Sequence, residues 1–366
     1  MCSNICPVEA ISMECDICGF MYPHIQDHCV DCNLCEKACE RRRMLSSNNR
    51  QDPDVYAAWS KDKETRFKST SGGIFTELAT WVLTNGGYVA GAAYNKDNLV
   101  EHILISDVKG LELIRQSKYI QSDTKQIYSA IGELLGQGKM VAFCGAPCQV
   151  AALHAYLGNR KYDNLYTFDF ICRGMNSPKA YISWLKEIEK EYRGKIERVW
   201  FKYKEKGWKK SPKCTRIDFK DKSSVVLEQE NNLFMCGYLT HNLYIRPSCG
   251  NCDFKGISRN SDITLADFWG IENELDDDNG VSLVIVNSPK GKLLIENICA
   301  NIEIHKRSFE EILKGNVCFD NSVNISHESR KFLEDLDKYS FSYCLKLYSK
   351  KESKIKSMLK KLFVFR

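Results

Sequence analysis

The stretch Cys29–Cys39 reads CVDCNLCEKAC, and it decides how the beginning of the chain folds. Its cysteines are Cys29, Cys32, Cys35 and Cys39, so their spacing is C-x2-C-x2-C-x3-C. The short steps let one loop wrap three corners of a four-iron cube, and soft thiolates are the ligands that such a cluster takes. A stretch this short cannot build an apolar core of its own, so we expect it to fold around its metal.

A second cysteine run is expected upstream, because in two-cluster ferredoxins the fourth cysteine of each run binds the other cluster. The chain begins MCSNICP, which has the C-x3-C-P ending of such a run. We therefore expect one complete [4Fe-4S] ligand set, which consists of Cys6, Cys29, Cys32 and Cys35. For the other cluster, only Cys2 and Cys39 stand in their expected places.

The missing cysteine pair leaves three interpretations open. Cys15 and Cys18 form a further C-x2-C that would complete the other cluster, or they are incidental thiols, or the natural start of the chain lies upstream. Zinc also binds C-x2-C pairs, but it rarely needs three consecutive short steps plus a distant C-x3-C-P. Glu40 stands where proline is usual after the fourth cysteine, and this changes no ligand.

The composition is that of a protein with a substantial core and a redox or metal function. The chain has 366 residues, a formal charge of +5 and 18 cysteines, eight of them in the first 39 residues. The mild charge does not favour nucleic acid as a partner. Neither a signal peptide nor an apolar stretch of about 18 residues is present, so we expect a cytoplasmic protein without a transmembrane segment. In a reducing compartment, so many cysteines favour metal ligation over disulfides.

Strands alternate with helices from about residue 55, which predicts an α/β or α+β core with a mixed sheet. Strands are predicted over 55–59, 88–94, 99–105, 139–143, 165–171, 196–203, 214–220, 224–229, 262–267 and 281–286. Helices are predicted over 72–83 and 123–135, after Pro147, over 177–192 and after Pro289. We divide the chain into the regions 1–45, 55–155, 156–325 and 326–366.

The last region is rich in lysine and has apolar residues at helical spacing. These residues are Leu345, Tyr348, Ile355, Met358, Leu359 and Leu362. Such a helix would dock peripherally on an anionic membrane or on a partner, or it would be a solvated terminal helix. The solvated helix is the favoured interpretation.

Three further stretches carry candidate chemistry. The stretch 69–75 (STSGGIF) opens a helix with hydroxyls and glycines, which is typical either of a phosphate site or of simple N-capping by Ser71. A second stretch, CGAPCQ at 144–149, lies where a strand turns into a helix. Cys148, Cys172 and the C-x2-C pair Cys249/Cys252 all lie at expected loop positions. They are buried structural cysteines or, if the fold gathers them, a further four-thiolate site.

Six blocks together resemble the coenzyme F420 hydrogenase/dehydrogenase beta-subunit family. They are 71–75 (SGGIF), 117–122 (SKYIQS), 145–149 (GAPCQ), 171–174 (ICRG), the Cys249/Cys252 pair and 261–270 (SDITLADFWG). The resemblance extends over about 55–290, and a ferredoxin-like N-terminal segment also fits the family. It implies an iron–sulfur flavoprotein oxidoreductase that contains FAD and exchanges electrons with a deazaflavin such as coenzyme F420 or with another organic hydride donor or acceptor. A redox partner protein or subunit is implied as well.

The resemblance also assigns roles to individual residues. The region 55–155 would bind the flavin, and 156–325 would be the C-terminal region of the beta subunit. The residues implied to contact the FAD phosphates and ribityl chain are Ser71, Gly72, Gly73, Ser117, Lys118, Tyr119, Gln121 and Ser122. Those implied to border the isoalloxazine are Gly145, Pro147 and Gln149. The resemblance also supports Cys148, Cys172, Cys249 and Cys252 as metal ligands. It identifies no catalytic acid or base.

Two departures from the family pattern bear on the reaction. Ala146 replaces the usual threonine, and Arg173 replaces the usual histidine. Arg173 and the basic stretch 202–210 would receive an anionic substrate, although a solvated basic face is the favoured interpretation. The alternative functions are a non-catalytic iron–sulfur electron-transfer adaptor and a flavin-dependent reductase associated with polysaccharide biosynthesis.

Overall fold

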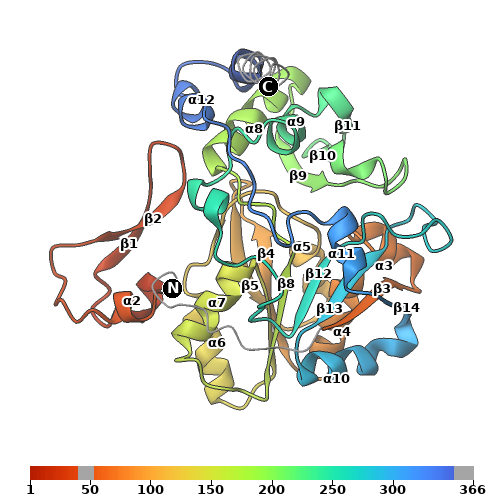
Figure 1. Ribbon diagram of the computed structural model, residues 1–366. Helices are drawn as coiled ribbons and strands as arrows, with labels where there is room; N and C mark the ends of the chain where they lie inside the picture. The colour runs from red at the N-terminus through yellow and green to blue at the C-terminus, as the bar shows by residue number, and fades with distance from the viewer. Residues whose placement is uncertain (40–52, 350–366) are drawn as a thin grey trace, which may run out of the picture.

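A nine-stranded mixed sheet forms the centre of the molecule (Figure 1). The computed structural model describes residues 1–39 and 53–349. In spatial order the strands are β14 (Ile302–Arg307), β3 (Asp54–Ser60), β13 (Ser282–Val286), β12 (Ile263–Asp267), β8 (Leu165–Phe170), β7 (Val141–Cys144), β4 (Tyr88–Tyr94), β5 (Val100–Ile105) and β6 (Ser122–Asp123). The central strands β12, β8, β7 and β4 are parallel, whereas β14, β3 and β13 pair antiparallel. The predicted mixed sheet is confirmed.

Helices cover both faces of this sheet. The helices on one face are α4 (Ile74–Thr84), α5 (Leu111–Ile114) and α10 (Pro289–Ile298). Those on the other face are α6 (Ile127–Gly136), α7 (Pro147–Tyr156) and α11 (Glu310–Gly315). Along β7, Ala142 packs on the first face and Phe143 on the second, and neither side chain is exposed. Burial on both faces is typical of parallel strands, and it explains why their sequences are apolar without alternation.

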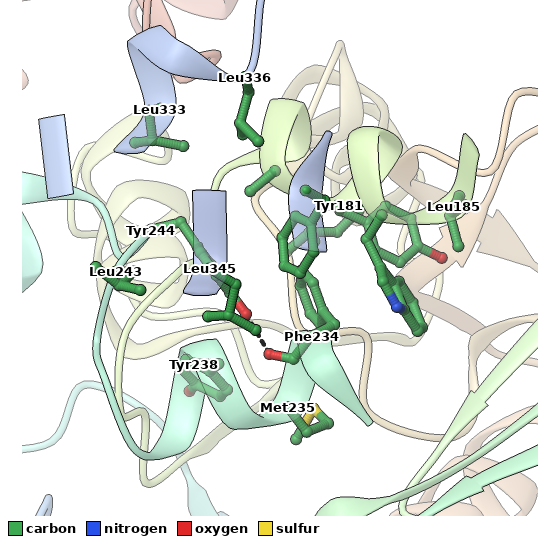
Figure 2. Close-up of a cluster of buried hydrophobic side chains, with 14 of the residues drawn as sticks. Tyr181, Leu185, Phe234, Met235, Tyr238, Leu243, Tyr244, Leu333, Leu336 and Leu345 are labelled. Carbon is green, nitrogen blue, oxygen red and sulfur yellow. Dashed lines mark hydrogen bonds between the residues drawn. The ribbon is translucent and has the colours of Figure 1, made fainter. Parts of the chain in front are cut away.

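A second hydrophobic cluster lies beside the sheet and is rich in aromatic side chains (Figure 2). It consists of side chains from a three-stranded antiparallel sheet and from the helices that pack on that sheet. The strands are β9 (Ile196–Phe201), β10 (Cys214–Phe219) and β11 (Ser224–Glu228), and the helices are α8 (Pro178–Tyr192), α9 (Leu233–Leu239), α12 (Ser329–Asp335) and a helical stretch at 341–349. Trp184 and Phe234 stack with ring centroids 5.1 Å apart, and the Tyr244 hydroxyl donates to the Phe234 carbonyl.

The N-terminal segment, defined as residues 1–39, is a β-hairpin flanked by two short helices. Its elements are α1 (Cys2–Ile5), β1 (Ile11–Cys15), β2 (Met21–Ile25) and α2 (Leu34–Lys37). In the hairpin, Ile11 pairs with Ile25 and Cys15 pairs with Met21. Phe20 is fully buried and belongs to the second hydrophobic cluster, so the segment is packed into the rest of the protein.

The remaining elements are short. They are α3 (Lys63–Lys68) and the 3-10 turns η2 (Val108–Gly110), η3 (Ser211–Lys213), η4 (Gln229–Asn231), η5 (Pro247–Asn251) and η6 (Cys299–Asn301). In the described ranges, no helix has the length and apolar character needed to cross a membrane.

Two predictions about element positions need correction. The helix predicted from 123 begins at Ile127, because Ser122 and Asp123 instead pair with β5 as the edge strand β6. In the predicted C-terminal amphipathic helix, Leu345 and Tyr348 are buried in the second hydrophobic cluster. They are therefore unavailable to a membrane or a partner. The other apolar positions of that helix lie outside the described residues.

Candidate metal centre

Four cysteines from three separate segments of the chain line one cavity. They are Cys148, Cys172, Cys249 and Cys252, the four thiols that the sequence placed at loop positions. We call them the core cysteines. The other residues that line the cavity are Pro147, Arg173, Gly174, Met175, Phe254, Lys255 and Arg259. The fold thus gathers side chains that are more than 100 positions apart in the sequence.

Strand ends and a helix start position the core cysteines. Cys148 is the second residue of α7, whose first turn is fixed by Pro147 and by the Gln149 side chain, which accepts a hydrogen bond from the Ala146 N–H at 2.9 Å. A helix N-terminus favours a thiolate, because the aligned peptide dipoles leave positive charge there. Cys172 follows the end of β8, and Cys249 lies in η5, where its N–H donates to the Arg246 carbonyl at 2.9 Å.

Gly174 lets these loops meet. Its φ is +153°, and a Cβ at this position would lie 2.6 Å from Cγ2 of Ile245 and 3.3 Å from Cβ of Cys249. A larger residue would therefore push the Cys172 loop away from the Cys249 loop.

Burial and the charge of neighbouring thiols raise the pKa of Cys148, Cys172 and Cys249, which favours their neutral thiol form. Burial raises the pKa of Cys148 to about 12, and the nearby thiols of Cys249 and Cys252 contribute to the increase. The pKa of Cys172 is raised even further for the same reasons. The positive charge of Arg246 acts in the opposite direction on Cys148 and Cys249. Thiols that repel one another when ionised need a cation among them to bind as thiolates.

Three basic side chains surround the cavity, and each also makes a contact that fixes its position. The Lys255 ammonium donates to the carbonyls of Cys172 at 2.6 Å and Cys318 at 2.8 Å. The Arg173 guanidinium donates to the side chain of Asn242 at 2.8 Å. Arg259 pairs with Asp169, at 3.7 Å between Nη1 and Oδ2. The sequence reasoning missed Lys255 and Arg259, although both closely follow the C-x2-C pair.

No set of three or more His, Cys, Asp or Glu side chains converges on a single metal ion within residues 1–39 and 53–349. The core cysteines therefore share a cavity without converging on one point.

In the N-terminal segment, the structure brings the two cysteine runs together. Burial raises the pKa of Cys2, and the thiols of Cys39 and Cys35 add to the increase, so these three side chains are electrostatic neighbours. The Ala10 N–H donates to the Cys6 sulfur at 3.2 Å. Between the cysteines of the second run, Asp31 and Asn33 have left-handed backbone angles, which tighten the loop that carries these cysteines.

Cys15 and Cys18 lie at the other end of the hairpin. A strand rises about 3.3 Å per residue, so Cys15 is about 13 Å along β1 from Ile11, which lies at the end nearer Cys6. Cys18 is buried, and its carbonyl accepts a hydrogen bond from the Ser177 hydroxyl at 2.6 Å. The structure thus favours the interpretation of Cys15 and Cys18 as incidental thiols.

The blocks implied to bind flavin lie side by side, but their polar side chains contact other protein groups. The Ser117 N–H donates to the Thr70 hydroxyl at 2.9 Å, which joins the two blocks. The Ser71 hydroxyl donates to the Val281 carbonyl at 2.7 Å. A Cβ on Gly72 would clash with the Ala58 carbonyl and with Ser282, so the backbone of β3 and β13 already requires glycine at this position.

Lys118 is partly buried, and backbone carbonyls hold its ammonium. Its ammonium donates to the carbonyls of Leu113 at 3.0 Å and Arg115 at 2.7 Å. Burial lowers the pKa of Lys118 to about 7, and the charge of Arg198 lowers it further. This lysine fixes the end of α5, and the structure provides no separate evidence that it contacts a phosphate.

The other residues of these blocks also make contacts within the protein. The Gln121 amide binds both the N–H of Met21 (2.9 Å) and its carbonyl (3.4 Å), so it anchors the N-terminal segment. The Gln149 amide donates to the Ser122 hydroxyl at 2.9 Å. Tyr119 is half-buried and meets Phe201 edge to face at 5.4 Å. Their assignment to FAD stays a prediction.

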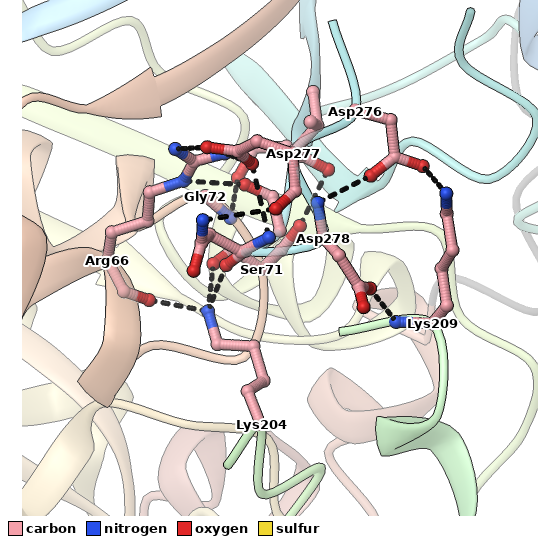
Figure 3. A network of polar contacts seen from close by, with 12 residues as sticks. Arg66, Ser71, Gly72, Lys204, Lys209, Asp276, Asp277 and Asp278 are labelled. Carbon is pink, nitrogen blue, oxygen red and sulfur yellow. Dashed lines mark hydrogen bonds and ion pairs between the residues drawn. The ribbon is translucent and has the colours of Figure 1, made fainter. Parts of the chain in front are cut away.

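The basic stretch 202–210 is a solvated face only in part, because Lys206, Lys209 and Lys210 are exposed whereas Lys202 and Lys204 are not. Lys202 is buried and pairs with Asp267. Lys204 is buried as well, and its ammonium donates to the carbonyls of Arg66, Ser71 and Asn279 at 2.5–2.8 Å (Figure 3). Burial lowers the pKa of Lys204 to about 7, and the charge of Arg66 contributes.

An acidic loop contributes to the same network. The Arg66 guanidinium forms a two-pronged contact with the Asp277 carboxylate at 2.6 and 2.8 Å, and Lys209 pairs with Asp276 at 3.0 Å (Figure 3). The first two lysines of the stretch are therefore internal supports of the 71–73 loop and of β12, and Lys209 is paired with protein acid.

The fold and this cavity define a mixed α/β protein with a cluster of four partly buried thiols. Residues 55–127 match the family model for the N-terminal part of the coenzyme F420 hydrogenase/dehydrogenase beta subunit, and residues 138–312 match the model for its C-terminal part. Together the two matches span more than half of the chain, which therefore belongs to the coenzyme F420 hydrogenase/dehydrogenase beta-subunit family, a family of oxidoreductases.

A solved structure has a similar fold. It is a chain of the F420-reducing [NiFe] hydrogenase complex from Methanosarcina barkeri, and the TM-score is 0.50 at 18% sequence identity. The superposition covers 85% of this chain and 95% of that chain. At this low sequence identity, the similarity is evidence for the fold alone. No curated protein sequence matches the chain.

Proposed function

We propose that this protein is an iron–sulfur flavoprotein oxidoreductase, which passes electrons between an organic hydride donor or acceptor and [4Fe-4S] clusters through FAD. The observation that carries the proposal is the gathering of the core cysteines around one cavity. Family membership supports it, because the family is redox-active.

The donor set of the cavity fits a four-iron cluster. In such a cluster each thiolate binds a different iron, so the four sulfur atoms stand farther apart than the ligands of a single zinc ion. The four thiols that line the cavity supply the soft donors that such a cluster needs. Cys148, Cys172, Cys249 and Cys252 would hold the cluster, which supplies one-electron redox chemistry.

The residues around the core cysteines exclude water and balance charge. Pro147, Met175 and Phe254 provide apolar walls, which keep solvent from the thiolates. Lys255 and Arg173 place positive charge at the same cavity and are held there by their contacts with protein oxygens. A cluster with four thiolates is anionic, so these cations lower the cost of burying it.

FAD enters the proposal through the family and not through a cavity of this structure. It would accept two electrons as hydride and return them singly. Ser71, Lys118 and Gln121, which would bind it, now contact protein groups, so they would have to exchange those contacts for the ligand. We derive no step through FAD.

The outer face of the N-terminal segment fits a redox partner protein. Val30 and Leu34 lie between the cysteines of the second run and have exposed fractions of 58% and 40%. Residues 1–39 contain six acidic side chains and a single lysine. Exposed apolar residues beside cluster ligands on an acidic surface favour a partner with a basic rim around an apolar patch.

A non-catalytic iron–sulfur adaptor is the second candidate function. It is favoured by the contacts that occupy the polar side chains of the flavin blocks. The two functions differ in flavin content, because an adaptor would contain clusters without FAD.

Anaerobic purification followed by flavin, iron and sulfide analysis tests the proposal. We expect bound FAD, together with iron that falls by the content of one cluster in the double variant Cys148→Ser/Cys249→Ser. The matched control is Cys299→Ser, an exposed cysteine outside both cysteine regions, which should keep all its iron. Iron without flavin would support the adaptor, and equal iron in the double variant and the control would refute the core cluster.

A further inference from the structure

The segment 318–326 lies against the loop that carries Cys249 and Cys252, and we call it the strap. Residues 318–320 belong to a turn, and 321–326 run as irregular chain. The strap follows α11 and lies beyond residue 312, where the match to the family model ends. The family match therefore assigns no role to these residues.

Two buried side chains anchor the strap in different parts of the protein interior. Phe319 has an exposed fraction of 1% and packs in the cluster on one face of the nine-stranded sheet. Val323 has an exposed fraction of 6% and packs in the second hydrophobic cluster. Because only three residues separate the two anchors, Ser322 between them is held in a fixed place.

The strap bonds directly to the chain around the C-x2-C pair. The Cys252 N–H donates to the Ser322 hydroxyl at 2.9 Å. Farther along the same loop, the Gly256 N–H donates to the Phe319 carbonyl at 2.7 Å. An amide that is partly removed from water needs such a partner, and the hydroxyl that serves Cys252 is 70 positions away in the sequence.

Lys255 extends this connection to another core cysteine. Its ammonium donates to the Cys318 carbonyl at 2.8 Å, at the start of the strap, and to the Cys172 carbonyl at 2.6 Å. Val323 packs close to the same loop, because a Cβ on Gly174 would lie 3.6 Å from its Cγ1. The strap therefore contacts the Cys172 loop as well as the loop around the C-x2-C pair.

We propose that the strap positions the core metal site and that Ser322 is its positioning residue: the Ser322 hydroxyl holds the backbone of Cys252, so that the Cys252 thiolate meets the metal in one orientation. The proposal rests on the core cluster of the proposed function and adds to it a part of the chain outside the family match. Groups that hydrogen-bond behind metal ligands orient those ligands, and their loss weakens metal binding by about tenfold or more.

Substitution at position 322 separates the hydrogen bond from the shape of the side chain. Ser322→Val and Ser322→Thr introduce branched side chains of nearly the same shape, but only threonine keeps an oxygen that can accept from the Cys252 N–H. Ser223→Val is the matched control, because the Ser223 hydroxyl also makes a hydrogen bond, to Asp221 at 2.6 Å, in the turn between β10 and β11.

The test uses the anaerobically purified full-length protein with two measurements. Amide hydrogen exchange of Cys252 reports the hydrogen bond. Iron release to a chelator reports the core site, taken as the part of the release that the double variant Cys148→Ser/Cys249→Ser lacks. We expect exchange to rise roughly fivefold and core iron to leave roughly tenfold faster in Ser322→Val. Ser322→Thr should restore both rates, and the control should change neither.

Three results would overturn the inference. They are exchange of the Cys252 amide at the wild-type rate in Ser322→Val, release of core iron at the wild-type rate in that variant, and equal behaviour of Ser322→Val and Ser322→Thr. If Ser322→Val does not fold, Ser322→Ala removes the oxygen without adding volume and is compared with Ser322→Thr in the same way. Failure of the proposed function is a different result, because the wild type and the double variant would then release the same iron while the exchange of Cys252 stays readable.

Discussion

The N-terminal segment and the core cavity both gather cysteines, but they do so by opposite means. In the segment the second run is set by local spacing, and Cys32 is exposed at the surface. The core cysteines come from four positions between 148 and 252, and helix, strand and glycine geometry bring them together inside the protein. Local spacing sets which cysteines of the segment are neighbours, whereas long-range packing gathers the core cysteines around one cavity.

The largest expected effect concerns Phe20, the side chain that fixes the segment to the core. Phe20→Ala removes a fully buried ring, which should cost about 3–5 kcal/mol of docking free energy. The segment should then exchange its amides freely while the nine-stranded sheet keeps its protection. Ile25→Ala, at a 58% exposed position of the same hairpin, should have almost no effect. Equal protection of the segment in the two variants would show that Phe20 does not fix it.

Gly174→Ala tests whether the core site is prepared by packing. The added Cβ would meet Ile245, and we expect a loss of about 1–3 kcal/mol in the free energy of unfolding together with reduced iron in the core site. Gly158→Ala is the control, because Gly158 also has a positive φ but no neighbouring atom within 4 Å. If both variants lose the same stability and neither loses iron, the loop contact is unimportant for the site.

The nine-stranded sheet should also be more acid-sensitive than the N-terminal segment, because it buries His102 against the Phe143 ring. Burial lowers the pKa of His102 to about 4, so between about pH 4 and 6.5 the unfolded chain binds the proton and the folded chain does not. This linkage should remove about 1 kcal/mol of stability at about pH 5.5. His102→Phe should weaken that pH dependence in thermal melts, and a slope identical to wild type would contradict the assignment.

The smallest expected effect concerns the Gln121 amide, which binds the backbone of Met21. Gln121→Ala should cost about 1 kcal/mol and raise the exchange of the Met21 amide roughly fivefold. Gln137→Ala, at an exposed position after α6, should leave that amide unchanged. Faster exchange throughout the protein, rather than at Met21, would mean that Gln121 supports the core instead of the segment.

The contrast between local spacing and long-range packing also explains which features could be predicted from the sequence. Alternating strands and helices predicted the mixed sheet, because that pattern is local. The N-terminal ligand sets rest on short local spacings and stay a prediction. The sequence shows that Lys202 and Lys204 are charged, but it does not show which groups they contact in the folded protein. Asp267 is 65 positions from Lys202, and the Asn279 carbonyl is 75 positions from Lys204. Lys255 and Arg259 were missed for the same reason, since only the folded chain places them beside Cys148.

The burial of Phe20 has a consequence for how the protein is made. The cluster that receives this ring also contains Phe341, Cys344, Leu345 and Tyr348, which are more than 300 positions later in the chain. A ribosome releases the N-terminal end first, at roughly 5–20 residues per second, so the segment emerges long before its seat is complete. Residues 1–39 are therefore synthesised well before the cluster that holds Phe20 is complete, and they are among the last residues to reach their final place.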